Sequence, residues 1–339
     1  MTDTSNRPAS ASSSSPRRVL VLGATGTIGT ATVRELVRRQ HEVVCLVREG
    51  GTGGRQHIEK LLDGAEIRSG DVTDLQSFAL ACAGNGGFDA LVSCMASRTG
   101  APKDAWAIDY QAHANALTAA KNAGISQMVL LSAICVQKPQ LAFQHAKLAF
   151  ENLLVESGLT YSIVRPTAFF KSLSGQIDRL KRGKPFVVFG NGKLTSCKPI
   201  SDHDLACYLA ECLDNPRLQN RILPVGGPGD AITPRQQGEY LFALLGQQPR
   251  FRHVPVALLG VIAKGLGGLG LMIPAVADKA ELARIGLYYA TESMLVLDPE
   301  TGRYDPSATP SFGSETLLEH YSRVIGGEIS NDRGDHAIF

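Results

Sequence analysis

Three glycines at a regular spacing form the pattern in this sequence with the clearest chemical meaning. Gly23, Gly26 and Gly29 follow an aliphatic run at residues 19–22 and open a segment with helical periodicity. A strand, a tight turn and a helix in this order bring backbone N–H groups and the positive end of the helix dipole to a pyrophosphate. We therefore predict a dinucleotide-binding turn, with cofactor contacts from Gly23, Thr25, Gly26, Thr27, Ile28 and Gly29.

The residue after the next strand bears on the choice of cofactor. A second aliphatic run, at residues 43–47, completes a βαβ unit, and Arg48 follows it where an NAD-binding protein would carry an acidic residue. A guanidinium binds a ribose 2′-phosphate through charge-assisted hydrogen bonds, so the sequence favours NADPH over NADH. The alternative is that Arg48 is a solvated residue at a strand end, next to Glu49.

The elements that must position these residues belong to an α/β fold. We predict a Rossmann-type, doubly wound parallel sheet at residues 18–168 and a smaller C-terminal substrate-binding lobe at residues 169–327, interleaved with the sheet. One of its helices is predicted over residues 104–123, with Trp106 facing inward. Residues 1–17 and 328–339 are predicted to be tails. The first tail has no apolar core and cannot be a secretory signal, and a short transit peptide is the alternative to disorder.

Composition and charge argue against several classes of protein. A net charge of +2 with 19% charged residues gives no case for binding nucleic acid. The seven cysteines include no C-x-x-C pair and no cluster with histidine at zinc spacing, so we expect reduced thiols and no metal site. The most apolar segment, residues 254–276, is broken by Lys264, glycines and prolines and does not qualify as a membrane span. It is either a buried helix–turn–helix, or a lid or peripheral membrane contact.

The glycine spacing, G-x-x-G-x-x-G, differs from the commonest dinucleotide fingerprint. It resembles the short-chain dehydrogenase/reductase superfamily, and its NmrA-like branch in particular. This resemblance implies that Asp71 and Val72 lie beside the adenine and that Ser132 faces the active site. Met95 begins a loop that should pass over the cofactor, as loops at the carboxyl ends of parallel strands do. The resemblance further implies that an R-P-x-x-F segment lies near the nicotinamide and contributes Pro166, Thr167 and Phe169.

The most informative departure from this superfamily is at Phe143. The usual helix carries Tyr-x-x-x-Lys, with both side chains on one face, a tyrosine acid and a lysine that holds the ribose and lowers the tyrosine pKa. This chain keeps Lys147 but has Phe143 in place of the tyrosine, so no phenolic proton donor exists there. We expect Lys147 to lie near the cofactor as ribose clamp and proton relay. The alternatives are a clamp without proton chemistry, or a solvated helix lysine.

The substrate pocket is predicted to begin just after the R-P-x-x-F segment. Phe143, Phe169 and Phe170 would give flat apolar walls, and Lys171 could pair with a substrate carboxylate. Packing of Phe169 and Phe170 in the protein core is an equally good interpretation.

The C-terminal third carries the most specific motifs. They are the segments YYATESMLVLD at residues 288–298, TG at 301–302, YD at 304–305, TPSFG at 309–313 and TLLEHY at 316–321. Together with the opening GATGTIG and the strand VVCLVRE, they resemble the divinyl chlorophyllide 8-vinyl reductases over residues 18 to about 327.

That resemblance implies reduction of the 8-vinyl group of divinyl chlorophyllide or protochlorophyllide to ethyl with NADPH, in chlorophyll or bacteriochlorophyll biosynthesis, without a metal or flavin of the protein's own. We expect a bacterial cytoplasmic protein, peripheral to the photosynthetic membrane if attached at all, rather than a plastid protein. Two alternatives stay open. One is a reductase of another conjugated substrate, and the other is an NADPH-binding redox sensor or structural subunit without turnover.

Overall fold

Short runs of valine, leucine and isoleucine form seven strands that pair in parallel into one sheet. The computed structural model describes residues 15–48, 54–82, 86–270 and 274–331, so most of the two predicted tails lies outside the described residues. The strand order is β3-β2-β1-β4-β5-β6-β8. The strands are β1 (Arg18–Leu22), β2 (Glu42–Val47), β3 (Glu66–Ser69), β4 (Ala90–Ser93), β5 (Gln127–Leu131), β6 (Thr160–Pro166) and β8 (Arg221–Val225). This order confirms the predicted Rossmann-type sheet.

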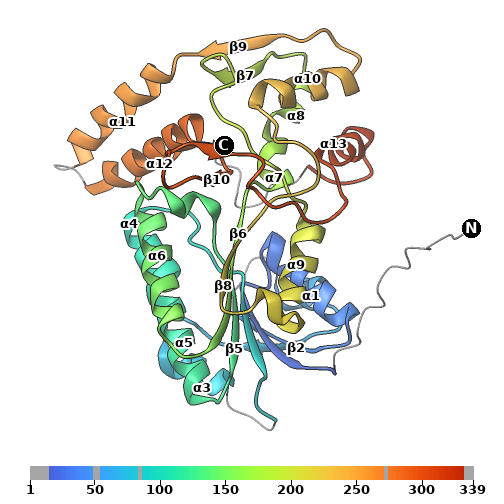
Figure 1. Ribbon diagram of the computed structural model, residues 1–339, viewed down its shortest axis with the longest axis vertical. Helices are drawn as coiled ribbons and strands as arrows, with labels where there is room; N and C mark the ends of the chain where they lie inside the picture. The colour runs from blue at the N-terminus through green and yellow to red at the C-terminus, as the bar shows by residue number, and fades with distance from the viewer. Residues whose placement is uncertain (1–14, 49–53, 83–85, 271–273, 332–339) are drawn as a thin grey trace, which may run out of the picture.

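Helices cover both faces of the sheet, and each face has its own apolar core (Figure 1). Apolar residues of α1 (Thr27–Arg38), α2 (Gly54–Leu61) and α9 (Asp202–Asp214) pack on one face. On the other face lie α3 (Leu75–Cys82), α5 (His113–Asn122) and α6 (Ala142–Val155). Strand β8 and helix α9 come from the segment predicted as the substrate region, so the sheet extends past residue 168, in keeping with the predicted interleaving. The domain boundary at residue 168 itself stays a prediction.

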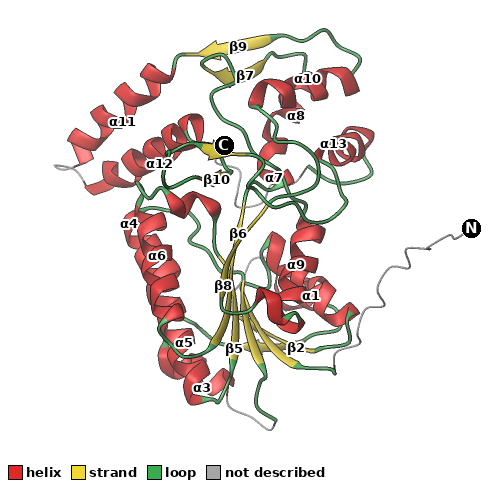
Figure 2. Cartoon of the chain, in the orientation of Figure 1, coloured by secondary structure: helices red, strands yellow, loops and turns green. Residues whose placement is uncertain are grey.

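A C-terminal lobe with a third apolar core lies beyond the carboxyl end of β6 (Figure 2). Its larger elements are α10 (Pro234–Leu244), α11 (Val256–Gly270), α12 (Pro274–Thr291) and α13 (Leu317–Gly326). The shorter elements are α7 (Phe170–Leu173), η3 (Ser174–Gln176), α8 (Ile177–Lys181), the parallel pair β7 (Phe186–Phe189) and β9 (Phe251–Val254), and the antiparallel pair β10 (Val296–Leu297) and β11 (Tyr304–Asp305). The short helix η4 (Pro216–Leu218) belongs to the sheet domain instead, where it connects α9 to β8.

The apolar segment at residues 254–276 is only partly buried. Helix α11 packs on α12, yet Leu258, Val261 and Ile262 are 50%, 69% and 42% exposed. The helix–turn–helix prediction is thus right about the helices but wrong about complete burial. In the part of the chain that the structure describes, every helix is too short or too polar to cross a membrane.

The predicted helix at residues 104–123 is interrupted. Helix α4 (Pro102–Ala105) passes into a π-helix, η1 (Trp106–Ala112), before α5 begins. Because a π-helix has more residues per turn than an α-helix, the α-helical periodicity used in the prediction does not hold here. Trp106 is 44% exposed, so its predicted inward position is wrong, and Asp109 is buried instead.

Candidate active site

Two of the three glycines in the turn are required by the packing of the protein itself. Gly23 has φ +71°, and a Cβ atom there would lie 2.7 Å from the backbone nitrogen of Met95. A Cβ at Gly29 would lie 2.0 Å from the carbonyl oxygen of Gly23. Close packing at these two glycines holds the start of α1 against β1 and the loop after β4, which includes Met95, next to the turn.

Gly26 differs from the other two glycines, and the space around it shows whether the turn fits a dinucleotide. Its φ is −74°, and the nearest atom to a Cβ there is 3.5 Å away, so nothing in the protein excludes a side chain. Gly26 is the N-cap of α1, provides no side-chain cap, and is followed by no acidic residue in the first turn. The N–H groups of this turn are thus suited to a phosphate that approaches closely, as the pyrophosphate of NADPH would.

The predicted adenine-side residues lie at the same edge of the sheet. Arg48 follows β2 and is exposed, and Asp71 follows β3. Hydrogen bonds from the backbone and hydroxyl of Thr73, at 2.8 and 2.7 Å, hold the pKa of Asp71 below its usual range, and the charge of Arg48 adds to this effect. Val72 is half-buried, and its carbonyl accepts from Asn115. We call residues 23–29, Arg48 and residues 71–72 the cofactor edge.

Lys147 forms a nearly buried ion pair that sequence reasoning did not anticipate. Its Nζ lies 2.9 Å from Oδ1 of Asp109, and the two side chains are 11% and 0% exposed. The backbone N–H of Ser97, in the loop after β4, donates to the same oxygen at 3.2 Å. The other oxygen, Oδ2, is buried without a hydrogen-bond partner among the described residues. Asp109 thus holds the ammonium of Lys147 in place through one oxygen and keeps the other as a vacant, buried acceptor.

His113 borders this ion pair but is neutral. Its Nε2 lies 2.9 Å from the Ser93 hydroxyl and its Nδ1 2.8 Å from the Ile108 carbonyl. Burial and the nearby charge of Lys147 lower the pKa of His113 to about 4. At neutral pH this histidine therefore supports β4 and η1 and carries no charge.

Phe143 occupies the position of the usual tyrosine, next to the loop after β4. A Cβ at Gly100 would lie 3.3 Å from Cδ1 of Phe143 and 3.1 Å from Cδ1 of Ile285 on α12. The C-terminal lobe thus reaches the start of α6. Phe143 is half-buried, which leaves its predicted contact with substrate as a prediction.

Ser132 belongs to a buried charged cluster at the end of β5. Its hydroxyl donates to the carboxylate of Glu151, which also pairs with Arg165. Because the proton of Ser132 is directed at Glu151, the hydroxyl is not poised as an acid toward a ligand. Its predicted catalytic role stays a prediction that this arrangement weakens.

The R-P-x-x-F segment is used largely by the fold. Pro166 ends β6, and the Thr167 hydroxyl donates to the carbonyl of Lys198. Phe169 packs partly against the core that α1 and α9 share with the sheet, and Phe170 is 3% exposed in the core of the C-terminal lobe. For Phe170 the core-packing interpretation is therefore the better one.

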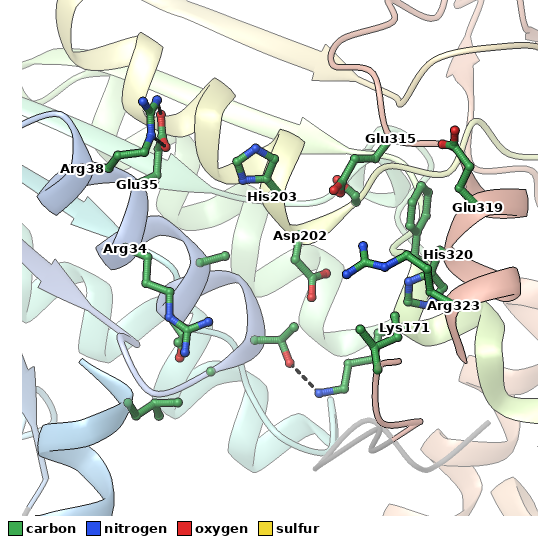
Figure 3. A pocket seen from close by; sticks show the side chains of 18 of the residues that line it. Arg34, Glu35, Arg38, Lys171, Asp202, His203, Glu315, Glu319, His320 and Arg323 are labelled. Atoms are coloured by element: carbon green, nitrogen blue, oxygen red, sulfur yellow. Dashed lines mark hydrogen bonds and ion pairs between the residues drawn. The ribbon is translucent and has the colours of Figure 1, made fainter. Parts of the chain in front are cut away.

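Lys171 lies at the glycine turn. Its Nζ donates to Oγ1 of Thr27 at 3.0 Å. Beside this contact is a cavity of about 1330 Å³ between α1, α9 and α13, whose walls carry charges of both signs, among them Arg34, Asp202 and Arg323 (Figure 3). Lys147 and Asp109 are not among its lining residues. The cavity thus adjoins the cofactor edge, and Lys171 points to the place expected for the pyrophosphate.

Several residues near Lys147 were missed from the sequence. Asp109 stands between Ile108 and Tyr110 in an apolar stretch, which could have marked it as a buried acid. On η2 (Ile134–Gln137), Cys135 lies with its Sγ 3.9 Å from the hydroxyl of Tyr289 on α12. No local pattern connects residues so far apart. We call Lys147, Asp109, Cys135 and Tyr289 the reaction face.

Within the described ranges, His, Cys, Asp and Glu side chains form no group of three that could bind a metal ion. The seven cysteines are free thiols.

Comparison with known proteins gives the family. An NAD(P)H-binding family model matches residues 23–216. The chain is 48% identical over 331 residues to the chloroplastic divinyl chlorophyllide a 8-vinyl-reductase of Oryza sativa subsp. indica, a match that covers 95% of this chain and 82% of that protein. The protein of the same name from Cucumis sativus is 49% identical over 332 residues, with 95% and 79% covered. The chain belongs to the divinyl chlorophyllide a 8-vinyl-reductase family.

This family assignment confirms the resemblance found in the C-terminal motifs and corrects the expected location. The rice and cucumber reductases are both chloroplastic, so the prediction of a bacterial cytoplasmic protein is wrong. The motifs carried the reaction but no information on the compartment. Among solved structures, an NADPH-dependent quinone oxidoreductase from Escherichia coli in complex with NADPH has a TM-score of 0.66 at 20% identity. That match covers 91% of this chain and 99% of that one. At this identity the likeness supports the fold alone.

Proposed function

We propose that this protein reduces the 8-vinyl group of a divinyl chlorophyllide to ethyl, with NADPH as cofactor, in chlorophyll biosynthesis. The observation that carries the proposal is the 48–49% identity, over 95% of the chain, to reductases named for this substrate. The glycine turn supports the use of NADPH independently. No packing contact within the protein requires a glycine at position 26, so the space beside Gly26 is available for a phosphate.

The residues of the cofactor edge bind and select the cofactor. NADPH supplies the hydride when it is bound. The N–H groups at the start of α1 hold the pyrophosphate, and Arg48 pairs with the 2′-phosphate. We assign Lys171 to the pyrophosphate as well, because its ammonium already donates to Thr27 at this turn. That assignment replaces the expected pairing of Lys171 with a substrate carboxylate.

On the reaction face, Lys147 holds the ribose of the cofactor and Asp109 fixes its ammonium in place. The vinyl group is conjugated to a macrocycle that spreads negative charge, so its reduction demands a weaker acid than reduction of a carbonyl. The presence of Phe143 in place of a tyrosine is therefore compatible with this reaction. A half-buried phenyl ring there would pack against the flat pigment.

We propose that the protein acts in the plastid, as the chloroplastic rice and cucumber reductases do, and one of its surfaces is suited to a membrane there. Helix α11 exposes Leu258, Val261 and Ile262, with Arg252 and Lys264 close by in the sequence. We propose that this helix rests on the surface of the membrane that holds the pigment. Sedimentation with anionic lipid vesicles should be lost in Val261→Glu.

One assay tests the function. Purified protein is incubated with NADPH and divinyl chlorophyllide, and the pigments are separated by chromatography. A monovinyl product is expected, and its absence would refute the proposal. NADPH binding without oxidation would favour the sensor alternative, and oxidation with a quinone alone would favour another substrate.

A further inference from the structure

The proposed reaction adds a hydride and a proton across a C=C bond. Because Phe143 replaces the tyrosine that is the usual acid, the residue that donates the proton has still to be identified. This inference rests on the proposed function. The donor must carry a proton at neutral pH, lie near Lys147, and be accessible to a substrate.

Helix α12 lies against the start of α6, where the phenol is missing. Oε1 of Glu281 accepts a hydrogen bond from the backbone N–H of Ala142 at 2.9 Å. Four residues later, Ile285 shares the neighbourhood of Gly100 with Phe143. Residues three and four apart share one face of a helix, so Tyr288 and Tyr289 continue this face toward Cys135. The Tyr288 hydroxyl donates to the Cys135 carbonyl at 2.9 Å.

Tyr289 brings its hydroxyl to the same place, and part of this residue stays exposed. The hydroxyl oxygen lies 3.9 Å from Sγ of Cys135, and the residue is 39% exposed. Burial raises the pKa of the Cys135 thiol, and Gln144, Tyr289 and Lys147 lower it by smaller amounts. The ammonium of Lys147 therefore acts on the same thiol that the phenol contacts.

The other polar groups nearby are less suitable. Cys135 is 2% exposed, and burial holds the pKa of its thiol above the usual range. The Ser132 hydroxyl donates to Glu151. Both ring nitrogens of His113 are hydrogen-bonded. Burial also holds the pKa of Tyr289 well above its usual range, so its hydroxyl is protonated at neutral pH.

We infer that Tyr289, from the C-terminal lobe, donates the proton that completes reduction of the vinyl group. The phenolic O–H bond breaks and a C–H bond forms at the vinyl carbon that does not receive the hydride. The phenolate then takes a proton from water. One hydride and one proton are thereby added to the pigment.

The test compares Tyr289→Phe with Tyr288→Phe, since the two tyrosines are adjacent on α12. With divinyl chlorophyllide and NADPH, kcat of Tyr289→Phe is expected to fall on the order of 10²-fold or more, the usual contribution of a general acid. Its dissociation constant for NADPH should stay within about twofold of wild type. The ratio of kcat in H₂O to kcat in D₂O should rise, because proton transfer becomes the slow step. Tyr288→Phe loses only hydrogen bonds to backbone carbonyls and should keep the wild-type isotope ratio.

Wild-type kcat in Tyr289→Phe would overturn the inference, as would loss of turnover in Cys135→Ala with Tyr289→Phe unaffected. If Tyr289→Phe does not fold, 3-fluorotyrosine at residue 289 keeps the hydroxyl and makes it more acidic. Its single-turnover rate should then rise about twofold or more, and an unchanged rate would overturn the inference. Failure of the proposed function looks different, because the wild type itself would form no monovinyl product.

Discussion

The cofactor edge and the reaction face hold the two halves of the reaction, and they are built in different ways. The cofactor edge consists of three short segments that come after the neighbouring strands β1, β2 and β3. The reaction face combines residues from η1, η2, α6 and α12. Lys147 meets Asp109 within the sheet domain, whereas Tyr289 meets Cys135 only because the C-terminal lobe packs on α6. One region depends on backbone conformation and the other on tertiary contacts between distant segments.

This difference predicts how each region responds to substitution. At the cofactor edge a change should alter cofactor binding with little effect beyond the turn. On the reaction face a change should affect turnover and stability together, because the same contacts hold the lobe in place.

Lys147→Met should have the largest effect. We expect kcat/KM with divinyl chlorophyllide to fall by about 10²-fold or more, because the cofactor loses the ammonium that positions its ribose. Asp109 would be left buried without its partner, at a cost of about 3–5 kcal/mol in the free energy of unfolding. Steady-state kinetics, NADPH titration and urea unfolding measure these effects.

Lys138→Met is the matched control for Lys147→Met. Lys138 is 43% exposed and pairs with Glu292, and such pairs contribute about 0–1 kcal/mol. Full turnover with unchanged NADPH affinity in Lys147→Met would refute the ribose-binding role assigned to that lysine.

The glycine turn offers a comparison within the cofactor edge. In Gly29→Ala the new Cβ would lie 2.0 Å from a backbone oxygen, so we expect the free energy of unfolding to fall by about 3 kcal/mol. In Gly26→Ala the nearest atom is 3.5 Å away, so the thermal midpoint should hardly change. NADPH affinity should nevertheless drop tenfold or more, or about 1.4 kcal/mol. Wild-type NADPH affinity in Gly26→Ala would refute the assignment of this space to the pyrophosphate.

The cofactor edge could be predicted from the sequence much better than the reaction face. The parallel sheet, the turn and the positions of Arg48 and Asp71 were predictable, because alternating aliphatic runs and turn glycines are local signals. The π-helix was not, so Trp106 was predicted to face inward and Asp109 was overlooked.

The partners of Lys147 and Tyr289 could not be predicted, because no local pattern encodes which distant segments meet. Lys171 shows the same limit. Its sequence position suggested the substrate, and only the contact with Thr27 reveals that it lies at the turn. The family, in contrast, could be predicted, since the C-terminal motifs are specific without any knowledge of their contacts.

Arg48→Ala sharpens the cofactor choice with a smaller effect. Loss of the charge-assisted hydrogen bonds to a 2′-phosphate should lower the preference for NADPH over NADH by about 10- to 100-fold, or about 1.5–3 kcal/mol. The ratio of kcat/KM for the two cofactors measures it. Arg55→Ala on α2 is the control, because Arg55 pairs with Glu59 at the surface. If both variants keep the wild-type ratio, Arg48 does not bind the 2′-phosphate and is only a solvated residue at the end of a strand.

The smallest effect on activity is expected in Glu35→Gln, which lies on α1 behind the cofactor edge. Burial raises the pKa of Glu35, but hydrogen bonds from Arg38 and Arg39 outweigh this and lower it to about 2, against an ordinary 4.5. Since the folded state favours the charged form, the stabilisation is complete above pH 4.5 and is lost as the pH falls toward 2.

We therefore expect Glu35→Gln to unfold about 1–2 kcal/mol more easily than wild type at pH 7, after allowing for solvent around the arginines. In urea unfolding the difference should shrink at pH 3. Turnover per folded molecule at pH 7 should match wild type, because α1 keeps its start at the turn. A difference in stability that stays constant between pH 7 and pH 3 would mean that the ion pair is not its source. A loss of NADPH affinity would mean that the cofactor edge depends on distant packing as much as the reaction face does.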